Sequence, residues 1–280
     1  MKLSIVTPSF RSSSWLKLCI ASVADQGVDV EHIVQDAESD DGTQDWLPHD
    51  KRVKAFIEKD AGMYDAVNRG WKRANGDILA YLNCDEQYLP GALKTVQKKF
   101  ETHPEIEVLF AGGIVTDAEG RYICHRHSLV PNPHGIWFRF PVLTCSLFLR
   151  RKVVHERNIL FDTRWRVLGD LHWVAALIKS KVPMVACDEF TSVFTDTGDN
   201  LCLQPRALTE MADTRALLPG WLKLTRHIWI AHHHLRRWKA GQFATEATSY
   251  DVYTKRSPDK RVTIKVSKPT ALWRTRVKTA

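Results

Sequence analysis

The sequence predicts an α/β fold, with a mostly parallel sheet flanked by helices and a C-terminal helical and basic extension. Three observations predict it: short apolar strands alternate with amphipathic helices over the first hundred residues, polar residues follow the strand ends, and the charge changes after about residue 200. Such alternation favours parallel strands joined by right-handed crossovers. The 280 residues, 44% of them hydrophobic, suffice for one large domain with an appendage.

The first hundred residues carry the clearest pattern. Apolar runs predict strands at residues 3–7, 31–36, 53–57 and 78–82, and helical spacing predicts helices from about residue 13 and over residues 63–74. The first strand is expected to end at Pro8, which has no N–H for the ladder. The pair Asn75-Gly76 is a stop signal for the helix before it.

The middle of the chain is less regular and rich in aromatic residues. A helix is expected to about residue 102, strands over residues 106–110 and 142–149, a hairpin around residues 117–120, and a helix over residues 171–179. The change of pattern divides the first domain, residues 1–204, into halves at residues 1–100 and 101–204. Residues 205–280 form the extension.

The extension carries the basic charge of the chain. It holds 16 Lys or Arg against 5 Asp or Glu, whereas residues 1–200 hold 24 against 27. Such a balance suggests an anionic partner, for which phospholipid headgroups, a lipid diphosphate and nucleic acid are the alternatives, with solubility as the simpler explanation.

A helix expected over residues 221–240 is basic and amphipathic. Its apolar positions follow helical spacing, and no acidic residue lies between Gly220 and Gly241. This pattern fits a membrane-surface element, and equally a helix packed on the domain with its basic face in water. The run His232-His233-His234 is expected to be solvated, because consecutive helical residues point in different directions. Residues 262–266 offer at most one exposed strand in a loosely ordered tail.

Two adjacent carboxylates follow the strand at residues 78–82, in Asn83-Cys84-Asp85-Glu86. Ligands of open α/β sheets bind beyond the carboxyl ends of such strands. Neighbouring acidic side chains repel each other unless a cation or a proton lies between them. The pair therefore suggests a hard divalent cation with oxygen ligands, with a solvated acidic turn as the simpler alternative.

Three strand ends are expected to meet at one edge of the sheet. They carry Thr7-Pro8-Ser9, Asp36 and Asp85, a combination suited to a nucleotide. The six cysteines contain no CxxC pair and are interpreted as free thiols of a reducing compartment. No apolar stretch suits a secretion signal or a membrane span, so we expect a cytoplasmic protein, at most peripheral on the inner face of the cell membrane.

Five motifs occur in a characteristic order. They are SIVTPSFR (4–11), HIVQDAESDDGT (32–43), the block from EKDAGMYDAVNRG to NGDILAYLNCDEQYLPGAL (58–93), TCSLFLRR (144–151) and FDTRWRVLGDLHW (161–173). On these motifs residues 1–200 resemble the family 2 inverting glycosyltransferases of the GT-A type. The resemblance implies a Rossmann-like, GT-A-like sheet whose first half binds a nucleotide-sugar donor and whose second half binds the acceptor.

The resemblance also implies site residues. Asp85 would bind Mg²⁺ or Mn²⁺ bridging the two donor phosphates, and Asp170 would act as general base on the acceptor hydroxyl, although it also fits a helix cap. The donor site would consist of Thr7, Pro8 and Phe10 along the base, Asp36 at the base or ribose, Asp65 and Asn68 at the diphosphate or sugar, and Asn83 as a further nucleotide-sugar residue.

Four positions depart from the family pattern. Glu38 stands where a glycine is usual, Cys84 replaces a common serine, Glu86 is the second acid of the metal motif, and His172 replaces a frequent aspartate. Glu38 adds charge near the nucleotide pocket. His172 is expected to cap a turn rather than to bind the acceptor.

These expectations combine into one predicted function. It is a metal-dependent inverting glycosyltransferase that moves a sugar, from a UDP-sugar, to a saccharide or lipid-linked saccharide acceptor in cell-surface polysaccharide biosynthesis. A sugar nucleotidyltransferase is one alternative, but the segment after the first strand lacks the glycines of its phosphate loop. A nucleic-acid-binding protein that uses the basic tail is the other, less favoured alternative.

Overall fold

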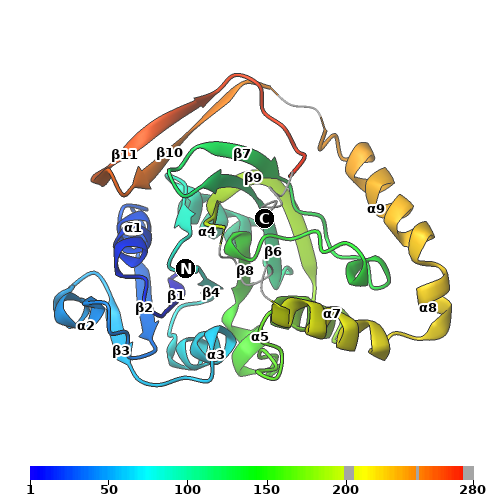
Figure 1. The fold of residues 1–280 in the computed structure, drawn as a ribbon, viewed down its shortest axis with the longest axis horizontal. Helices are drawn as coiled ribbons and strands as arrows, with labels where there is room; N and C mark the ends of the chain where they lie inside the picture. Colours follow the sequence, from blue (N-terminus) through cyan, green and yellow to red (C-terminus); the bar gives the residue numbers. More distant parts are fainter. Residues whose placement is uncertain (199–204, 244–245, 274–280) are drawn as a thin grey trace.

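The computed structural model describes residues 1–198, 205–243 and 246–273. Within them a nine-stranded sheet has the order β3-β2-β1-β4-β8-β6-β9-β5, with β7 paired to β6 (Figure 1). The strands are β1 (Leu3–Ser9), β2 (Val30–Asp36), β3 (Lys54–Ile57), β4 (Ile78–Tyr81), β5 (Gln87–Tyr88), β6 (Val108–Asp117), β7 (Tyr122–Arg126), β8 (Leu147–Arg150) and β9 (Met184–Asp196).

The helices of the described residues flank this sheet and continue into the extension. They are α1 (Ser13–Ala24), α2 (Thr43–Trp46), α3 (Met63–Arg73), α4 (Ala92–Thr102), α5 (Arg151–His155), α6 (Gly169–Lys179), α7 (Pro205–Leu217), α8 (Gly220–Leu224) and α9 (Arg226–Lys239). Short 3₁₀ turns occupy Leu47–His49, Gly135–Trp137 and Thr144–Ser146. The predicted α/β class is confirmed.

The first half of the sheet is parallel, as predicted. β1 pairs in parallel with β2 and with β4, and β2 pairs in parallel with β3. The expectation that Pro8 ends the first strand is wrong. β1 runs on to Ser9, and Pro8 lies opposite Gln35 of β2 within the ladder.

The second half of the sheet is mixed. β8 is antiparallel to both β4 and β6, and β9 runs parallel to β6. The strand expected over residues 142–149 is shorter, because a 3₁₀ turn at Thr144–Ser146 delays it to Leu147. The sequence pattern did not predict β9. Asp188 and Glu189 interrupt its apolar residues, where the register with β6 also shifts.

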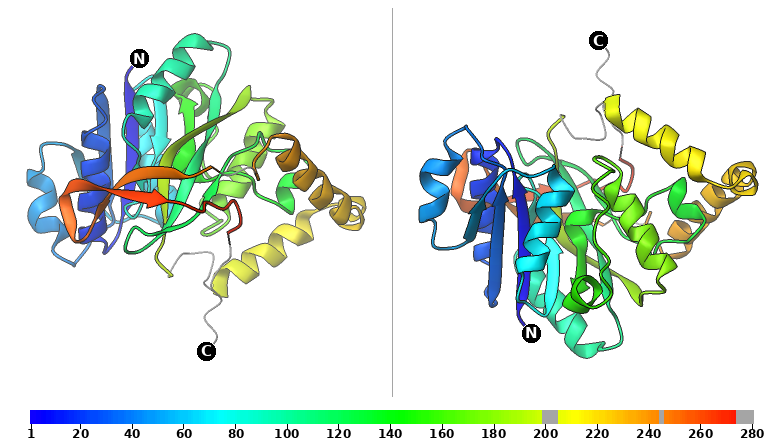
Figure 2. Two further views of the ribbon diagram at one scale, coloured as in Figure 1. Left: turned by 90° about the horizontal axis from the view of Figure 1, so that it is seen from above. Right: turned by 90° about the horizontal axis from the view of Figure 1, so that it is seen from below.

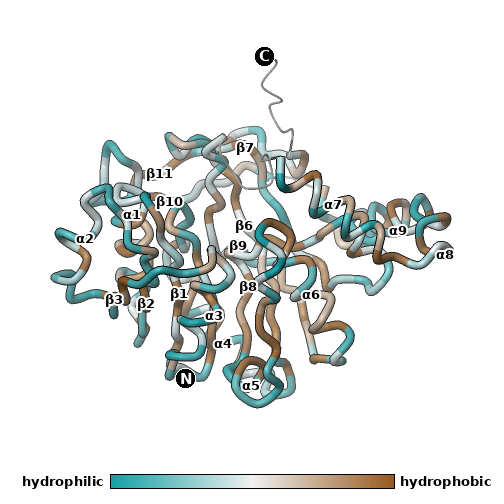
Figure 3. Tube along the Cα trace, turned by 60° about the horizontal axis from the view of Figure 1, so that its bottom comes forward, coloured by the Kyte–Doolittle hydropathy of each residue, from teal (hydrophilic) through white to brown (hydrophobic). Residues whose placement is uncertain are grey.

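Two apolar layers cover the two faces of the sheet. Helices α3, α5 and α6 cover one face, where Trp71, Phe161 and Trp173 stack with ring centroids 5.1 to 5.4 Å apart. Helices α1 and α4 cover the other face. Figure 3 shows the hydrophobic strands between these layers and the helices of the extension at one side.

The last part of the chain folds differently from the prediction. β10 (Thr248–Thr254) and β11 (Ser257–Val266) form an antiparallel hairpin, so the expectation of a loosely ordered tail is wrong over these residues. Tyr250 and Val252 are buried against Ile114 of β6 and Val193 of β9. The hairpin lies across the top of Figure 1, over β7 and α1.

The helix expected over residues 221–240 is broken at Thr225 into α8 and α9. Its apolar stripe faces outward, since Leu224, Ile228 and Trp238 are 85%, 63% and 68% exposed. The side chains that α9 buries are His233 and Arg237, so the expectation that all three histidines are solvated is wrong for His233. No helix of the described residues has the length and apolar character needed to cross a membrane.

Candidate active site

The acidic loop after β4 lies at the carboxyl edge of the parallel strands. The N–H of Leu82 donates to the carbonyl of Val6 (2.9 Å), which ties the loop to β1. The Asn83 N–H donates to Glu86 Oε2 (2.8 Å). Glu86 is thereby turned inward and 1% exposed, whereas Asp85 stays partly accessible. Of the two acids, Asp85 is therefore the one that is open to a ligand.

The two acids of this loop have no ion-pair partner among the described residues. Burial raises the pKa of Asp85, and burial together with the charge of Asp85 raises the pKa of Glu86 to about 8. Asn83 Oδ1 and Glu86 Oε1 are buried and accept no hydrogen bond from the described residues. Both observations fit a loop that holds a cation, because a divalent ion would satisfy the free oxygens and favour the ionised carboxylates.

The donor set of this loop is an incomplete cage. The described residues contain no group of three or more His, Cys, Asp or Glu side chains placed around one ion. Mg²⁺ in nucleotide sites commonly takes one or two carboxylates from the protein and its other ligands from phosphates and water. Asp85, with Asn83 beside it, offers such a partial set.

Asp170 lies in the first turn of α6, on the other half of the domain. The close packing of Gly169 puts it there, since a Cβ on Gly169 would come within 2.5 Å of the Tyr64 ring. Tyr64 in turn donates its hydroxyl to the carbonyl of Val167 (3.1 Å), and the N–H of Leu171 donates to Asp170 Oδ1 (2.8 Å). The carboxylate is therefore held in a fixed place between α3 and α6.

Burial raises the pKa of Asp170 to about 6, against the hydrogen bond from the Leu171 N–H that lowers it. A carboxylate with this pKa is ionised at neutral pH and is still a better proton acceptor than an ordinary aspartate. Burial raises the pKa of Tyr81, which lies at the end of β4, and the nearby charges of Asp170 and Glu86 raise it further. Asp170 and Glu86 of the acidic loop are therefore both near Tyr81.

Glu210 is a site residue that the sequence prediction missed. It lies on α7, is 4% exposed, and its carboxylate accepts hydrogen bonds from the N–H groups of three successive residues, Arg166, Val167 and Leu168 (2.8 to 2.9 Å). These residues lead directly into α6. The signal available in the sequence was an acid, Glu210, near the start of a basic extension. α7 is therefore tied to the loop before α6.

The residues implied for the nucleotide base divide into two groups. Phe10, 54% exposed at the end of β1, has the Arg11 guanidinium over its ring at 5.0 Å. Thr7 and Pro8 are buried in the strand. The Thr7 hydroxyl bonds to His32 Nε2 (2.9 Å) inside the core, so of these three side chains only Phe10 presents a free surface.

Asp36 is fully buried at the end of β2. Its two oxygens accept hydrogen bonds from the N–H and the hydroxyl of Ser39 (both 2.8 Å), and the Ser39 hydroxyl accepts from the Arg11 N–H (2.8 Å). Asp36 therefore holds the loop after β2 against the loop after β1. Glu38 within that loop has φ 57°, the left-handed conformation that explains why a glycine is usual there.

Asp65 and Asn68 both lie on α3. Asp65 is paired with Arg69 (2.8 Å) and accepts from the Ala61 N–H (2.9 Å) at the start of the helix. The Asn68 side chain donates to the carbonyl of Phe161 and accepts from its N–H, both at 2.9 Å. The polar atoms of Asn68 thus tie α3 to the segment that leads to Asp170.

The expectation that His172 caps a turn is wrong. Its Nε2 makes a hydrogen bond with Thr214 Oγ1 of α7 (2.9 Å), and its ring stacks on Trp165 with centroids 3.8 Å apart. Trp137 contacts the same ring edge-on at 5.7 Å. His172 therefore joins α6 to the extension, at the same place as Glu210.

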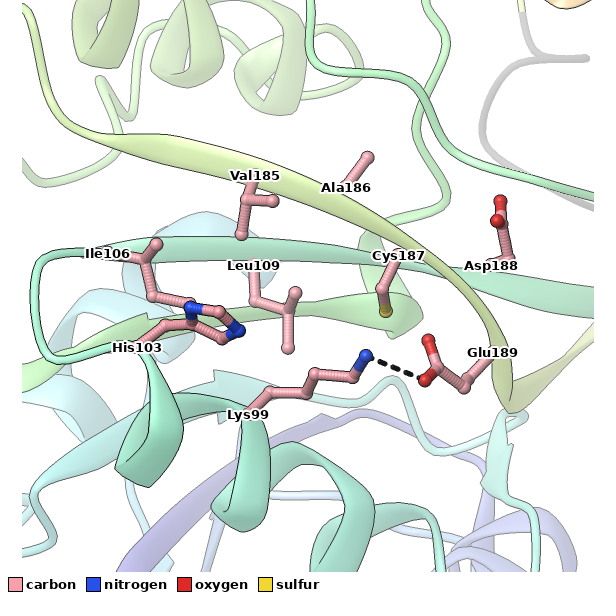
Figure 4. Close-up of a pocket in the computed structure, with 9 residues that line it drawn as sticks. All are labelled: Lys99, His103, Ile106, Leu109, Val185, Ala186, Cys187, Asp188 and Glu189. Carbon is pink, nitrogen blue, oxygen red and sulfur yellow. Dashed lines mark ion pairs between the residues drawn. The ribbon is translucent and has the colours of Figure 1, made fainter. Parts of the chain in front are cut away.

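A separate pocket lies away from these residues. Its volume is about 580 Å³, and α4, β6 and β9 line it (Figure 4). The polar groups in it include Lys99 and Glu189, which are paired at 2.8 Å. None of the predicted site residues lines this pocket, so the candidate active site rests on the acidic loop and Asp170.

Known proteins resemble this chain in sequence. An uncharacterized glycosyltransferase of Nostoc sp. is 23% identical over 185 residues, which are 61% of this chain and 57% of that protein. The GalNAc(5)-diNAcBac-PP-undecaprenol beta-1,3-glucosyltransferase of Campylobacter jejuni is 33% identical over 105 residues, 35% of this chain and 34% of that protein. The chain thus spans less than two thirds of the length of either relative.

Solved structures resemble it in fold. S. aureus TarS 1-349 in complex with UDP-GlcNAc superposes with a TM-score of 0.60 at 17% identity, over 76% of this chain and 64% of that chain. The mannosyltransferase PcManGT of Pyrobaculum calidifontis, in complex with GDP-Man and Mn²⁺, gives a TM-score of 0.53 at 14% identity, over 83% and 75% of the two chains. Both likenesses concern the fold.

A family model extends these likenesses to the motifs. The model for glycosyl transferase family 2 matches residues 4–158, more than half of the chain and including the acidic loop after β4. Together with the folds of the similar structures, this match confirms the resemblance drawn from the motifs. The chain belongs to glycosyl transferase family 2 and has a GT-A-type fold.

Proposed function

We propose that the protein is a metal-dependent inverting glycosyltransferase that takes its sugar from a nucleoside diphosphate sugar, in the first place a UDP-sugar. The observation that carries the proposal is the pair of Asp85 and Asp170. They come from opposite halves of the domain, and Tyr81 at the end of β4 is near both Asp170 and Glu86, the neighbour of Asp85 in the chain. One site can therefore hold the donor diphosphate at Asp85 and an acceptor hydroxyl at Asp170.

Asp85 would hold Mg²⁺ or Mn²⁺, which when bound neutralises the charge that develops on the departing diphosphate. The accessible ring of Phe10 offers an apolar face to the base, and Asp36 supports the loop beside it through Ser39. Asp65 and Asn83 would contact the diphosphate or the sugar, and Asn68 ties α3 to the segment that leads to Asp170. Asp170 would take the proton of the attacking hydroxyl, and attack opposite to the leaving group inverts the anomeric centre.

The donor is tested by turnover of a panel of nucleotide sugars, UDP- and GDP-linked, with Mn²⁺ or with EDTA. The expected result is release of the nucleoside diphosphate from a UDP-sugar only when the metal is present. The UDP-GlcNAc complex of TarS and the GDP-Man complex of PcManGT supply the two donor classes to compare. Release of pyrophosphate instead would favour a sugar nucleotidyltransferase.

We further propose that the acceptor is a saccharide or lipid-linked saccharide of a cell-surface polysaccharide, reached at the inner face of the membrane. The outward apolar stripe of α8 and α9 supports a membrane surface, because a helix packed with its basic face in water would bury that stripe. Exposed Lys223 and Arg226 lie on the same two helices and favour anionic lipids. The name of the C. jejuni relative includes PP-undecaprenol, which agrees with a lipid-linked acceptor.

Membrane association is tested by flotation with phosphatidylglycerol-containing vesicles. The double variant Leu235→Ser/Trp238→Ser is expected to bind at least about tenfold more weakly than the wild type, since each side chain contributes about 1.5 kcal/mol or more on burial. Leu208→Ser, at an exposed apolar position on α7, is the matched control. Point variants are preferable to removing residues 205–280, which would also remove Glu210. Equal flotation of all three proteins would contradict the membrane proposal.

A further inference from the structure

We propose that a second, cationic pocket between β7, α9 and the segment after Trp137 binds the phosphate or diphosphate group of an amphiphilic acceptor. The pocket has a volume of about 340 Å³. Its polar lining consists of Arg126, Arg139, Arg237, His233 and His234. The inference rests on the proposed function, because it names where the acceptor's charged group would lie.

The three guanidinium groups of this pocket have no acidic partner among the described residues. Arg237, 9% exposed, donates to the Gln242 side chain (3.2 Å) and to the carbonyl of Ala271 (3.3 Å). Arg139 donates to the carbonyl of Phe138 (3.2 Å). The Arg126 guanidinium has no hydrogen-bond or ion-pair partner among the described residues and lies over Trp273, 6.0 Å from the ring centroid. All these acceptors are neutral.

The pKa values of the basic groups in the pocket reflect their burial and the positive charge around them. Burial lowers the pKa of Arg126 and of Arg237. Burial and the nearby arginines lower the pKa of His233 to about 4. Half-buried like charges without counterions are costly unless an anion joins them. Arginines that converge from separate segments match the geometry of a phosphate.

The larger pocket on α4 provides the contrast. There the cation Lys99 is neutralised by Glu189 (Figure 4), so that pocket has no unpaired charge to offer an anion. Neutralisation of this kind is the usual state of a structural lysine or arginine near a pocket. In the cationic pocket three arginines have no acidic partner among the described residues, which favours a binding role over a structural one.

The surroundings of the cationic pocket suit an amphiphile. Arg237 shares α9 with the exposed Ile228, Leu235 and Trp238, so an acyl or polyprenyl chain can lie along the helix while its phosphate enters the pocket. Figure 2 shows α8 and α9 projecting from the body of the molecule. Arg236 fixes α9 to the body by donating to the carbonyl of Val130 (2.7 Å).

The pocket is also connected to the candidate active site. Trp137 contacts His172, two residues after Asp170, and Arg139 follows Trp137 by two residues in the chain. A phosphate held by Arg139 would therefore be anchored to the segment that borders the general base. This connection favours the acceptor over the donor, whose diphosphate belongs at Asp85.

The test measures binding of inorganic pyrophosphate and of farnesyl diphosphate in EDTA, which removes metal-dependent binding at Asp85. Both probes are expected to raise the thermal unfolding temperature of the wild type. Arg126→Gln and Arg139→Gln are each expected to weaken that binding about tenfold, the loss for one charge-assisted hydrogen bond. Arg126→Gln breaks no hydrogen bond among the described residues, so it should unfold without ligand at the wild-type temperature or above. Arg215→Gln, at an exposed position on α7, is the matched control.

Three results would overturn the inference. The first is that the wild type binds neither pyrophosphate nor farnesyl diphosphate. The second is equal affinity in Arg126→Gln and Arg215→Gln. The third is a loss in Arg126→Gln that appears with phosphatidylglycerol vesicles but not with farnesyl diphosphate. The last would assign the pocket to lipid headgroups. Hydrolysis of the UDP-sugar is measured in parallel: its absence in the wild type would reject the proposed function, whereas its persistence in Arg126→Gln would leave the binding data to decide the pocket.

Discussion

Replacing Asp170 with asparagine is expected to lower sugar transfer by a factor of about 10² to 10⁴, the usual contribution of a general base. The substitution keeps an oxygen that can accept from the Leu171 N–H, so the first turn of α6 should persist. In the wild type the rate should rise about tenfold per pH unit up to pH 6 and level off above it, because the pKa of Asp170 is about 6. The residual rate of the variant should not show this rise between low pH and pH 6. Initial rates between pH 4.5 and 8.5 measure both effects.

The same variant should be more stable than the wild type. The pKa of Asp170 is raised from 3.8 to about 6 in the folded protein, so the folded state binds the proton more tightly. The stability that this provides is complete below pH 3.8 and is lost as the pH rises through 6. Above pH 6 the asparagine variant should therefore gain at most about 3 kcal/mol, and near pH 3.8 almost nothing.

Asp162→Asn is the matched control for this prediction. Asp162 lies in the same segment, and its bond with the Arg164 guanidinium lowers its pKa. The ionised Asp162 therefore stabilises the fold at neutral pH, and this stabilisation is lost as the pH falls. The Asp162→Asn variant should gain no stability at pH 7.5. Urea unfolding at pH 4 and pH 7.5 compares the three proteins. An Asp170→Asn protein with wild-type activity would remove Asp170 from its proposed role.

Replacing Asp85 with asparagine is expected to reduce metal-dependent turnover of the donor by a factor of at least about 100. Asp85 would hold the metal ion, and a bound metal ion that stabilises the charge on the leaving group contributes several kcal/mol. The Mn²⁺ concentration needed for half-maximal rate should rise as well. Glu86→Gln is the matched control, since Glu86 is turned inward and bonded to the Asn83 N–H. It should lose less activity than Asp85→Asn. Equal losses, or equal Mn²⁺ dependence in all three proteins, would contradict the assignment of Asp85.

The parallel half of the fold could be predicted because each of its strands is a short apolar run with a clear stop. β4 and α3 lie within one residue of their expected ends. β9 and the β10–β11 hairpin could not, since their apolar positions depend on partners far away in the chain. Asp188 and Glu189 interrupt the pattern of β9, and Val252 is buried only because β6 and β9 lie beneath it.

The candidate site shows the same division. Asp85 and Asp170 could be named from motifs that keep a local context of strand or helix. The roles of Glu210 and His172 depend on α7 returning to the loop before α6, a contact over more than 40 residues. The outward direction of the apolar stripe of α9 could not be predicted either. Helical spacing shows which side of the helix is apolar but not whether that side faces the sheet.

The most direct measurement of the central claim is a crystal structure with the UDP-sugar that proves active and Mn²⁺, recorded at a wavelength where manganese scatters anomalously. An anomalous peak within bonding distance of an Asp85 oxygen and of the donor diphosphate is expected, with the Asp170 carboxylate facing the anomeric carbon from the side opposite the diphosphate. A peak elsewhere, or an Asp170 carboxylate turned away from the sugar, would contradict the account.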